Sequence, residues 1–288
     1  MSEPMNFLGL GPERSDPATA RYVVLPVPYE QTVSYKGGTA AGPAAILDAS
    51  AQVELWDEEL GIEYANAGVA TLPELAAAPT PAEQMARVRA AADDVLQRGQ
   101  VLLTLGGEHS ITAPAVAATA AVAPGPLSVL QIDAHADLRS QYEGDPHSHA
   151  SVMARVLETT EHLVQVGIRS YSPEEARALP DRVKRFWTPR RIAVTPDWID
   201  GALDELTEHV YITLDIDGLD PSLAPGTGTP EPGGLTWWQL TELLRAVGRE
   251  KTVLAADVVE VRPLGENHVT EFVAARAACK IIAYTQQR

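Results

Sequence analysis

Six side chains that can bind metal ions stand at the ends of three short apolar runs. They lie in the segments 106–109, 133–137 and 215–217, and they are His109, Asp133, His135, Asp137, Asp215 and Asp217. Residues two apart on a strand point to the same side, so the three ligand-type side chains of segment 133–137 share one face. We therefore expect three neighbouring strand ends to bring four aspartates and two histidines together.

The charge of such a cluster indicates its chemistry. Four close carboxylates raise one another's pKa, and their burial is costly unless the charge is compensated. Two divalent cations would resolve this conflict, and an oxygen-rich set without thiolates suits manganese, magnesium or a related hard ion better than structural zinc. A lone Asp-x-Asp or a lone His is more simply a turn or a satisfied polar residue, but the combination favours a metal site. Glu108 faces away from His109 by strand alternation, so we interpret it as a supporting residue and not a seventh ligand.

The segments that must position these residues are of two alternating kinds. Apolar, β-rich runs typical of strands buried on both faces are Tyr22–Pro26, Val101–Leu105, Leu127–Ile132, Leu163–Ile168, Val210–Leu214 and Thr252–Val259. Segments with helical spacing are Pro81–Arg98, Ile111–Ala121, Val152–Glu158, Pro196–Glu208, Trp237–Val247 and Val269–Tyr284. The alternation predicts an α/β fold with a mainly parallel sheet covered by helices. No linker divides the chain, so we expect residues 1–288 to form one domain with its ligand site beyond the carboxyl ends of the strands.

Charge, cysteine content and the N-terminal sequence narrow the function further. The formal net charge of −17 disfavours binding to nucleic acid or an anionic membrane surface and favours cationic partners. Cys279 is the only cysteine, so neither an internal disulfide nor a thiolate zinc site can form. The segment Met1–Asp16 lacks the basic and apolar regions of a secretion signal, and no stretch reaches the roughly 18 apolar residues of a membrane helix. These features predict a cytoplasmic protein.

Three motifs resemble the signatures of a known family. They are Gly106-Gly-Glu-His-Ser110, Asp133-Ala-His-Ala-Asp137 and the long segment Asp215–Leu235, and they are similar to the three signatures of the ureohydrolase (arginase/agmatinase) family. The resemblance extends from Pro28–Thr39 to Asn267–Phe272, which is nearly the whole chain. It implies an arginase-like fold, a three-layer α/β/α sandwich, and it is closest in character to agmatinase.

The resemblance implies two Mn²⁺ ions in each subunit. It implies one ion held by His109, Asp133, Asp137 and Asp215, and another held by Asp133, His135, Asp215 and Asp217. Asp133 and Asp215 would then bridge the two ions. Two such ions lower the pKa of a shared water toward about 7, so hydroxide is the nucleophile that this arrangement implies.

Roles for four further side chains follow from the same resemblance. Glu260 would grip the guanidinium by paired charge-assisted hydrogen bonds, although by position alone it could be an ordinary strand-end carboxylate. Asp137 would carry a proton from the attacking hydroxide to the leaving nitrogen. His149 matches the mobile-loop histidine of the family, with an unperturbed pKa of about 6.5 suited to acid–base work, whereas His147 is interpreted as a solvated loop residue. Thr229 would support Glu260.

The substrate is expected to be a small cationic guanidine. Hydrolysis of agmatine to putrescine and urea, a step of polyamine biosynthesis, is the leading prediction, and aminopropylagmatine, 4-guanidinobutyrate and arginine are the alternatives. The loop Leu138–Ser148 is expected to decide between them. Its acids Glu143 and Asp145 could favour a distal ammonium, whereas Arg139 could bind a carboxylate or form a salt bridge within the loop.

Other classes of protein remain as alternatives. A deacetylase of related fold would use one metal, whereas the pair Asp215 and Asp217 favours two. A non-catalytic relative that binds metal or polyamine would be favoured by a damaged ligand set, but every expected ligand is present. A phosphoesterase would need a phosphate cradle, which the sequence lacks. Trp237 and Trp238 are more simply packing residues than a cation cage. The resemblance also implies a homo-oligomer, a trimer or a hexamer.

Overall fold

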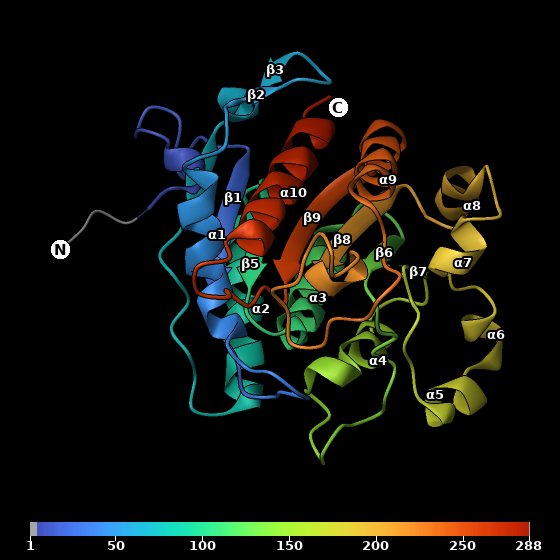
Figure 1. Cartoon of the computed structure of the whole chain (residues 1–288). Coiled ribbons are helices and arrows are strands. Elements are labelled where there is room, and N and C mark those ends of the chain that lie inside the picture. Colours follow the sequence, from blue (N-terminus) through green and yellow to red (C-terminus); the bar gives the residue numbers. More distant parts are fainter. Residues whose placement is uncertain (1–4, 288) are drawn as a thin grey trace.

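A seven-stranded parallel sheet forms the centre of the protein. The computed structural model describes residues 5–287, so the first four residues of the segment Met1–Asp16 lie outside it. The strand order is β4-β1-β5-β9-β8-β6-β7, and every pairing in this sheet is parallel (Figure 1). The bounds are β1 Tyr22–Val27, β4 Val69–Thr71, β5 Val101–Gly106, β6 Leu127–Ile132, β7 Leu163–Val166, β8 His209–Asp215 and β9 Thr252–Val259. The predicted parallel sheet is confirmed.

Helices cover both faces of the sheet and make the outer layers. One core lies under α1 (Gly42–Ser50), α8 (Trp198–Asp204), α9 (Trp237–Glu250) and α10 (Val269–Thr285), and the other lies under α2 (Pro81–Gln97), α3 (Thr112–Val122) and α4 (Val152–Val156). Neighbouring strand residues point into opposite cores, as Val23 and Val24 do, because side chains alternate along a strand. The three-layer α/β/α prediction is therefore confirmed.

The sequence patterns did not predict several short elements. They are the strand β4, the helix α1, the hairpin of β2 (Trp56–Asp57) and β3 (Ile62–Glu63), and the short helices α5 (Pro173–Ala178), α6 (Pro180–Val183) and α7 (Pro189–Ile192). Six 3₁₀ turns complete the list: η1 Phe7–Gly9, η2 Thr39–Ala41, η3 Tyr64–Ala67, η4 His109–Ile111, η5 His149–Ser151 and η6 Ile216–Gly218. Apart from the nine-residue α1, these elements have two to six residues, which is too short to show a hydrophobic period, so periodicity cannot reveal them.

The strand expected over Leu163–Ile168 ends at Val166, which was not foreseen. Gly167 has a φ of +95°, and a Cβ added there would lie 2.7 Å from the carbonyl oxygen of Asp133. Only glycine fits this close approach without strain. The turn thereby leaves room for the backbone of the segment 133–137.

The β2–β3 hairpin is tied to α10 by a buried charged cluster. Lys280 is fully buried, and its Nζ donates to Asp57 Oδ2 at 2.9 Å, to Glu59 Oε1 at 2.8 Å and to Glu58 Oε1 at 3.2 Å. The Tyr64 hydroxyl also donates to Asp57 Oδ2, at 3.0 Å. Buried charges are tolerated only when they are paired and hydrogen-bonded, and this cluster satisfies both conditions.

No helix within residues 5–287 combines the length and the apolar character needed to cross a bilayer.

Candidate metal centre and active site

The predicted metal-binding side chains meet at the carboxyl edge of the sheet. His109 begins the turn η4 just after β5, and Asp133 follows β6 directly. Asp215 ends β8, and Asp217 lies in the turn η6 that follows. Because β8 and β6 are neighbours and β5 is separated from β8 by β9 alone, these strand ends converge on one place. The expected convergence of three strand ends is what the structure shows.

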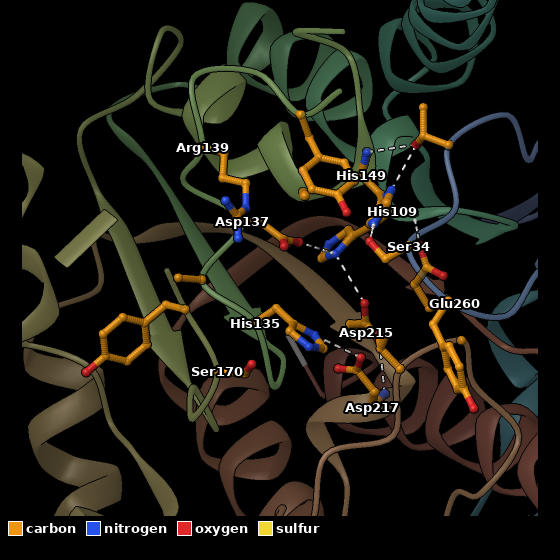
Figure 2. Close-up of a pocket in the computed structure, with 18 of the residues that line it drawn as sticks. Ser34, His109, His135, Asp137, Arg139, His149, Ser170, Asp215, Asp217 and Glu260 are labelled. Carbon is orange, nitrogen blue, oxygen red and sulfur yellow. Dashed lines mark hydrogen bonds and ion pairs between the residues drawn. The ribbon is translucent and has the colours of Figure 1, made fainter. Parts of the chain in front are cut away.

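Two histidines face carboxylates, and Figure 2 shows Asp137 and Asp215 beside His109 and Asp217 beside His135. His109 Nδ1 lies 3.2 Å from Asp133 Oδ2, 3.2 Å from Asp137 Oδ2 and 3.4 Å from Asp215 Oδ2. His135 Nδ1 lies 3.0 Å from Asp217 Oδ2 and 3.7 Å from Asp133 Oδ1. Among residues 5–287, two groups have ligand atoms close enough to hold an ion, namely His109–Asp133–Asp215 and Asp133–His135–Asp217. Asp133 belongs to both groups, whereas Asp215, which was also expected to bridge, belongs to the first alone, and Asp137 belongs to neither.

The chemistry of this donor set fits two divalent cations. His109 Nδ1 is buried and has no hydrogen-bond partner in the described part of the chain, while Nε2 lies 2.8 Å from Thr213 Oγ1. The unpartnered nitrogen therefore points a ligand lone pair among carboxylates. Burial, with the charges of Asp217 and Asp133, raises the pKa of Asp215 well above its ordinary value, and burial with the Asp133 charge raises that of Asp137 to about 6. A cation would relieve both effects by favouring the ionised carboxylates.

Two of the site residues have left-handed backbone conformations, which residues other than glycine rarely adopt. Asp137 has a φ of +54° and Glu260 has a φ of +62°. A non-glycine residue held in such a region costs on the order of 1–3 kcal/mol, and residues of this kind cluster at active sites. The surrounding fold therefore holds both carboxylates in place against a local energetic cost.

Glu260 faces the same cavity as the metal cluster. The cavity has a volume of about 520 Å³, and its lining includes Glu260, Thr229, His149 and the histidines of the cluster. The His109 backbone N–H donates to Glu260 Oε1 at 2.7 Å, which fixes the carboxylate. Burial raises the pKa of Glu260 well above its usual range. Among the described residues, no hydrogen bond joins Thr229 to Glu260, so the structure places the two together without the direct support that was expected.

His149 is held by a segment to which the sequence assigned no role. Its Nδ1 lies 2.9 Å from Thr32 Oγ1, and its Nε2 lies 2.8 Å from Ser34 Oγ. Burial, with the charges of His109 and His135, lowers the pKa of His149 to about 4, well below the unperturbed value used in the sequence argument. Thr32 and Ser34 lie in the segment Pro28–Thr39. The resemblance of this segment to the family was the one feature of the sequence that could have indicated their role.

Glu108 shapes the same segment. Its carboxylate accepts hydrogen bonds from the backbone N–H groups of Gln31 and Thr32, both at 2.6 Å, and from the hydroxyl of Ser110 at 2.5 Å. Glu108 thus turns away from the metal cluster and anchors the segment that contacts His149. The structure agrees with its interpretation as a supporting residue.

The loop Leu138–Ser148 lines the cavity with other residues than the two acids that were expected to face the substrate. Arg139 and Tyr142 line it, whereas Glu143, Asp145 and His147 do not. Arg139 forms no ion pair within the described part of the chain, and its guanidinium instead lies 5.4 Å from the centre of the Tyr142 ring. The salt bridge considered for Arg139 is therefore not formed. Acidic residues from outside this loop also line the cavity, namely Glu174, Glu175 and Glu231.

The two tryptophans at the start of α9 differ from each other. Trp237 packs against the core, which agrees with its predicted role in packing. Trp238 is 64% exposed, so that prediction is wrong for it.

Comparison with known proteins identifies the family. Residues 20–284 match the Arginase family. An N(1)-aminopropylagmatine ureohydrolase of Synechocystis sp. is 39% identical over 276 residues, which are 93% of this chain and 90% of that protein. A protein of the same name from Thermus thermophilus is 43% identical over 86% of this chain and 85% of its own. The crystal structure of an agmatine ureohydrolase of Thermoplasma volcanium superposes with a TM-score of 0.89 at 30% identity, covering 100% of this chain and 96% of that one. The chain is therefore a ureohydrolase of the arginase family.

Proposed function

We propose that the protein hydrolyses the guanidinium group of N1-aminopropylagmatine and releases urea and the corresponding linear triamine. The observation that carries this choice is the similarity to relatives named for this substrate, at 39% and 43% identity. Relatives named agmatinase are 32–34% identical. Agmatine, the leading substrate in the sequence argument, is therefore the second candidate. It is supported by the agmatine ureohydrolase structure that superposes over the whole chain.

The site has the groups that this reaction needs. We propose that His109, Asp133, Asp137 and Asp215 hold one divalent ion, and that Asp133, His135, Asp215 and Asp217 hold the other. Manganese is the ion that we propose, since the donors are mostly carboxylate oxygens with two imidazoles. When bound, such a pair of ions supplies an activated water at neutral pH. Every other part of the proposed mechanism is assigned to side chains of this chain.

Glu260 binds the guanidinium in this proposal. The His109 N–H occupies one side of its Oε1, so the carboxylate has a fixed orientation toward the cavity. A planar guanidinium can donate two parallel hydrogen bonds to a carboxylate, and the cation favours the ionised form that burial alone disfavours. The substrate is thereby held with its central carbon beside the activated water.

Asp137 and His149 handle protons in this proposal. The Asp137 carboxylate, held beside His109 in the cluster, takes a proton from the attacking water and gives it to the departing amine. His149 has a lowered pKa of about 4, so its imidazole is neutral at pH 7. A neutral ring can accept a hydrogen bond from the leaving amine without repelling the cationic substrate.

The first prediction concerns the choice of substrate. We expect the manganese-loaded protein to release urea from aminopropylagmatine with the highest kcat/KM, followed by agmatine, when 4-guanidinobutyrate and arginine are compared at matched concentrations. Urea is measured, with Asp133→Asn as the blank. A preference for agmatine would make the second candidate the substrate. Absence of urea from all four, with two ions bound, would overturn the proposed function.

Glu174 and Glu231 give a second prediction, on recognition of the substrate tail. Both line the cavity, and a second ammonium on the substrate would favour them electrostatically. We expect the double variant Glu174→Gln, Glu231→Gln to raise KM for aminopropylagmatine roughly two- to tenfold, because exposed ion pairs are weak, with kcat little changed. Glu143→Gln is the matched control, since Glu143 does not line the cavity. Equal effects in control and double variant would contradict the assignment.

The oligomeric state, the metabolic role and the cellular location of the protein are proposals. We propose that the protein is a homo-oligomer, a trimer or a hexamer, which light scattering on the purified chain measures directly. A role in polyamine biosynthesis follows if the product is the triamine or putrescine. The cytoplasmic location predicted from the sequence also stays a prediction.

A further inference from the structure

A row of buried polar side chains crosses the sheet just beneath the metal cluster. Five strands contribute one residue each at paired positions, in the order Thr104, Asp257, Thr213, Gln131 and Gln165. Four of the five are fully buried and Gln165 is 3% exposed. Thr213 and Gln131 lie two residues before Asp215 and Asp133, so they share a face with these carboxylates. Burying polar groups in the middle of an apolar sheet costs free energy, so we expect these five side chains to have a function.

One half of the row supports His109. His109 Nε2 lies 2.8 Å from Thr213 Oγ1. Asp257 Oδ2 accepts hydrogen bonds from the hydroxyls of Tyr211 at 2.6 Å and of Thr112 at 2.8 Å. The Thr213 hydroxyl lies 3.5 Å from that of Thr112. Burial raises the pKa of Asp257, and hydrogen bonds from Thr213, Tyr211 and Thr112 oppose this rise.

The direction of these hydrogen bonds selects one tautomer of His109. A carboxylate only accepts, so Thr112 uses its single hydrogen on Asp257 and can only accept from Thr213. With its single hydrogen turned toward this pair, the Thr213 hydroxyl accepts from the His109 Nε2–H. In the neutral ring this leaves the lone pair on Nδ1, which faces the carboxylates, and this is the form that can bind a cation. Asp257 thereby sets the state of a ring that it does not touch.

The other half of the row supports Asp133. Gln131 Nε2 donates to Asp133 Oδ2 at 2.7 Å and to the His135 carbonyl at 3.2 Å. Gln165 Nε2 donates to Gln131 Oε1 at 2.6 Å and to the Ala136 carbonyl at 3.0 Å. Because the two backbone carbonyls only accept, they fix which end of each amide faces them. Gln165 thus keeps the Gln131 amino group turned toward Asp133.

We propose that Asp257 and Gln165 are positioning residues of the metal centre, Asp257 acting on His109 through Thr213 and Gln165 acting on Asp133 through Gln131. The inference rests on the metal binding of the proposed function. His109 belongs to one ion-binding group and Asp133 to both. Loss of Asp257 is therefore expected to weaken one ion, and loss of Gln165 to weaken both.

The test is a Mn²⁺ titration of the metal-free full-length chain, followed by calorimetry and by the electron paramagnetic resonance signal of free Mn²⁺. We expect Asp257→Asn to lower the affinity for one of two ions by up to about 10- to 100-fold, the effect usual for groups that hydrogen-bond to a metal ligand directly, as Thr213 does to His109. The new amide can donate to the neighbouring hydroxyls, turn Thr213 around and place a proton on His109 Nδ1. Gln165→Met lowers the affinity for both ions, since the 3.2 Å hydrogen bond to the His135 carbonyl is then the one remaining contact that opposes a turn of the Gln131 oxygen toward Asp133.

Thr104→Val is the matched control. Thr104 belongs to the same row and is fully buried, but its hydroxyl has no hydrogen-bond partner among the described residues. We expect this variant to bind both ions as the wild type does. Unchanged Mn²⁺ affinity in Asp257→Asn and Gln165→Met would overturn the proposal. So would losses of affinity that follow the unfolding free energy of the metal-free protein across all three variants, since that pattern indicates a structural role.

The Thr213 variants keep the test decisive if Asp257→Asn does not fold. Thr213→Ser retains the hydroxyl and is expected to retain wild-type affinity, whereas Thr213→Val loses affinity for one ion. Equal affinity in the two Thr213 variants would overturn the assignment of Asp257. A wild-type chain that binds no Mn²⁺ contradicts the proposed function itself, whereas two ions bound equally by wild type and variants contradict only this inference.

Discussion

Replacing Glu260 by Gln is expected to lower kcat/KM for the guanidine substrate by about two to four orders of magnitude. The variant keeps the size of the side chain, and an oxygen can still accept the His109 N–H. It loses the negative charge that pairs with the guanidinium. Two hydrogen bonds between charged groups contribute about 1.5–3 kcal/mol each, which sets the expected loss. Initial rates of urea release over a range of substrate concentrations give the ratio.

The control for this prediction is Glu266→Gln. Glu266 follows β9 as Glu260 does, but it is exposed and does not line the cavity. It should retain wild-type kinetics. Both proteins should also bind the same amount of Mn²⁺, because neither glutamate belongs to the ion-binding groups. A loss of less than tenfold in Glu260→Gln, with metal content unchanged, would show that the carboxylate does not bind the guanidinium.

Replacing Lys280 by Met is expected to give the largest loss of stability in the molecule, about 3–5 kcal/mol, the usual effect of leaving a buried charge unpaired. The substitution keeps the length of the side chain, but Asp57 remains fully buried without the cation 2.9 Å away. Urea denaturation at pH 7 measures the change. Lys184→Met is the control, since Lys184 and Asp181 form an exposed pair with 74% and 93% of the side chains accessible. It should change stability by less than about 1 kcal/mol.

The pH dependence of the Lys280 variant provides an independent check. Burial alone would raise the pKa of Asp57, but hydrogen bonds and charge from Lys280, with further hydrogen bonds from Leu60 and Tyr64, hold it below its usual value. A lowered pKa in the folded state stabilises the protein above the unfolded pKa of about 3.9, and this stabilisation is lost as pH falls through the folded value. The deficit of Lys280→Met should therefore be complete from neutral pH down to about pH 4 and shrink as pH falls below about 4, toward the folded pKa of Asp57. A deficit that stays constant with pH would argue against the ion pair as its cause.

The central strands could be predicted from the sequence because they are buried on both faces. β6 and β9 begin and end where their apolar runs do, at Leu127–Ile132 and Thr252–Val259. The three residues of β4 at the edge of the sheet provide no such run. Because ligand-type residues stand where the buried runs stop, the convergence of His109, Asp133 and Asp215 could also be predicted.

Contacts between distant segments could not be predicted in this way. His149 meets Thr32 across a separation of 117 residues, and no local pattern indicates that meeting. The pKa of His149 shows the same limit, since burial depends on the tertiary structure. The row from Thr104 to Gln165 could not be predicted for a related reason. Each of its members is a single polar residue within a strand, and only the strand register brings them side by side.

The strand order also constrains when the metal centre can form as the chain is synthesised and folds. β8 and β9 are made last among the strands, yet they occupy the middle of the sheet, between β5 and β6 (Figure 1). Until they insert, the ends of β5 and β6 have no strands to join them, and His109 and Asp133 have no reason to approach. Long-range parallel pairing of this kind is slow to form, since loop closure precedes any stabilising contact. The fold thus delays the assembly of its ion-binding groups until the C-terminal third of the chain is in place.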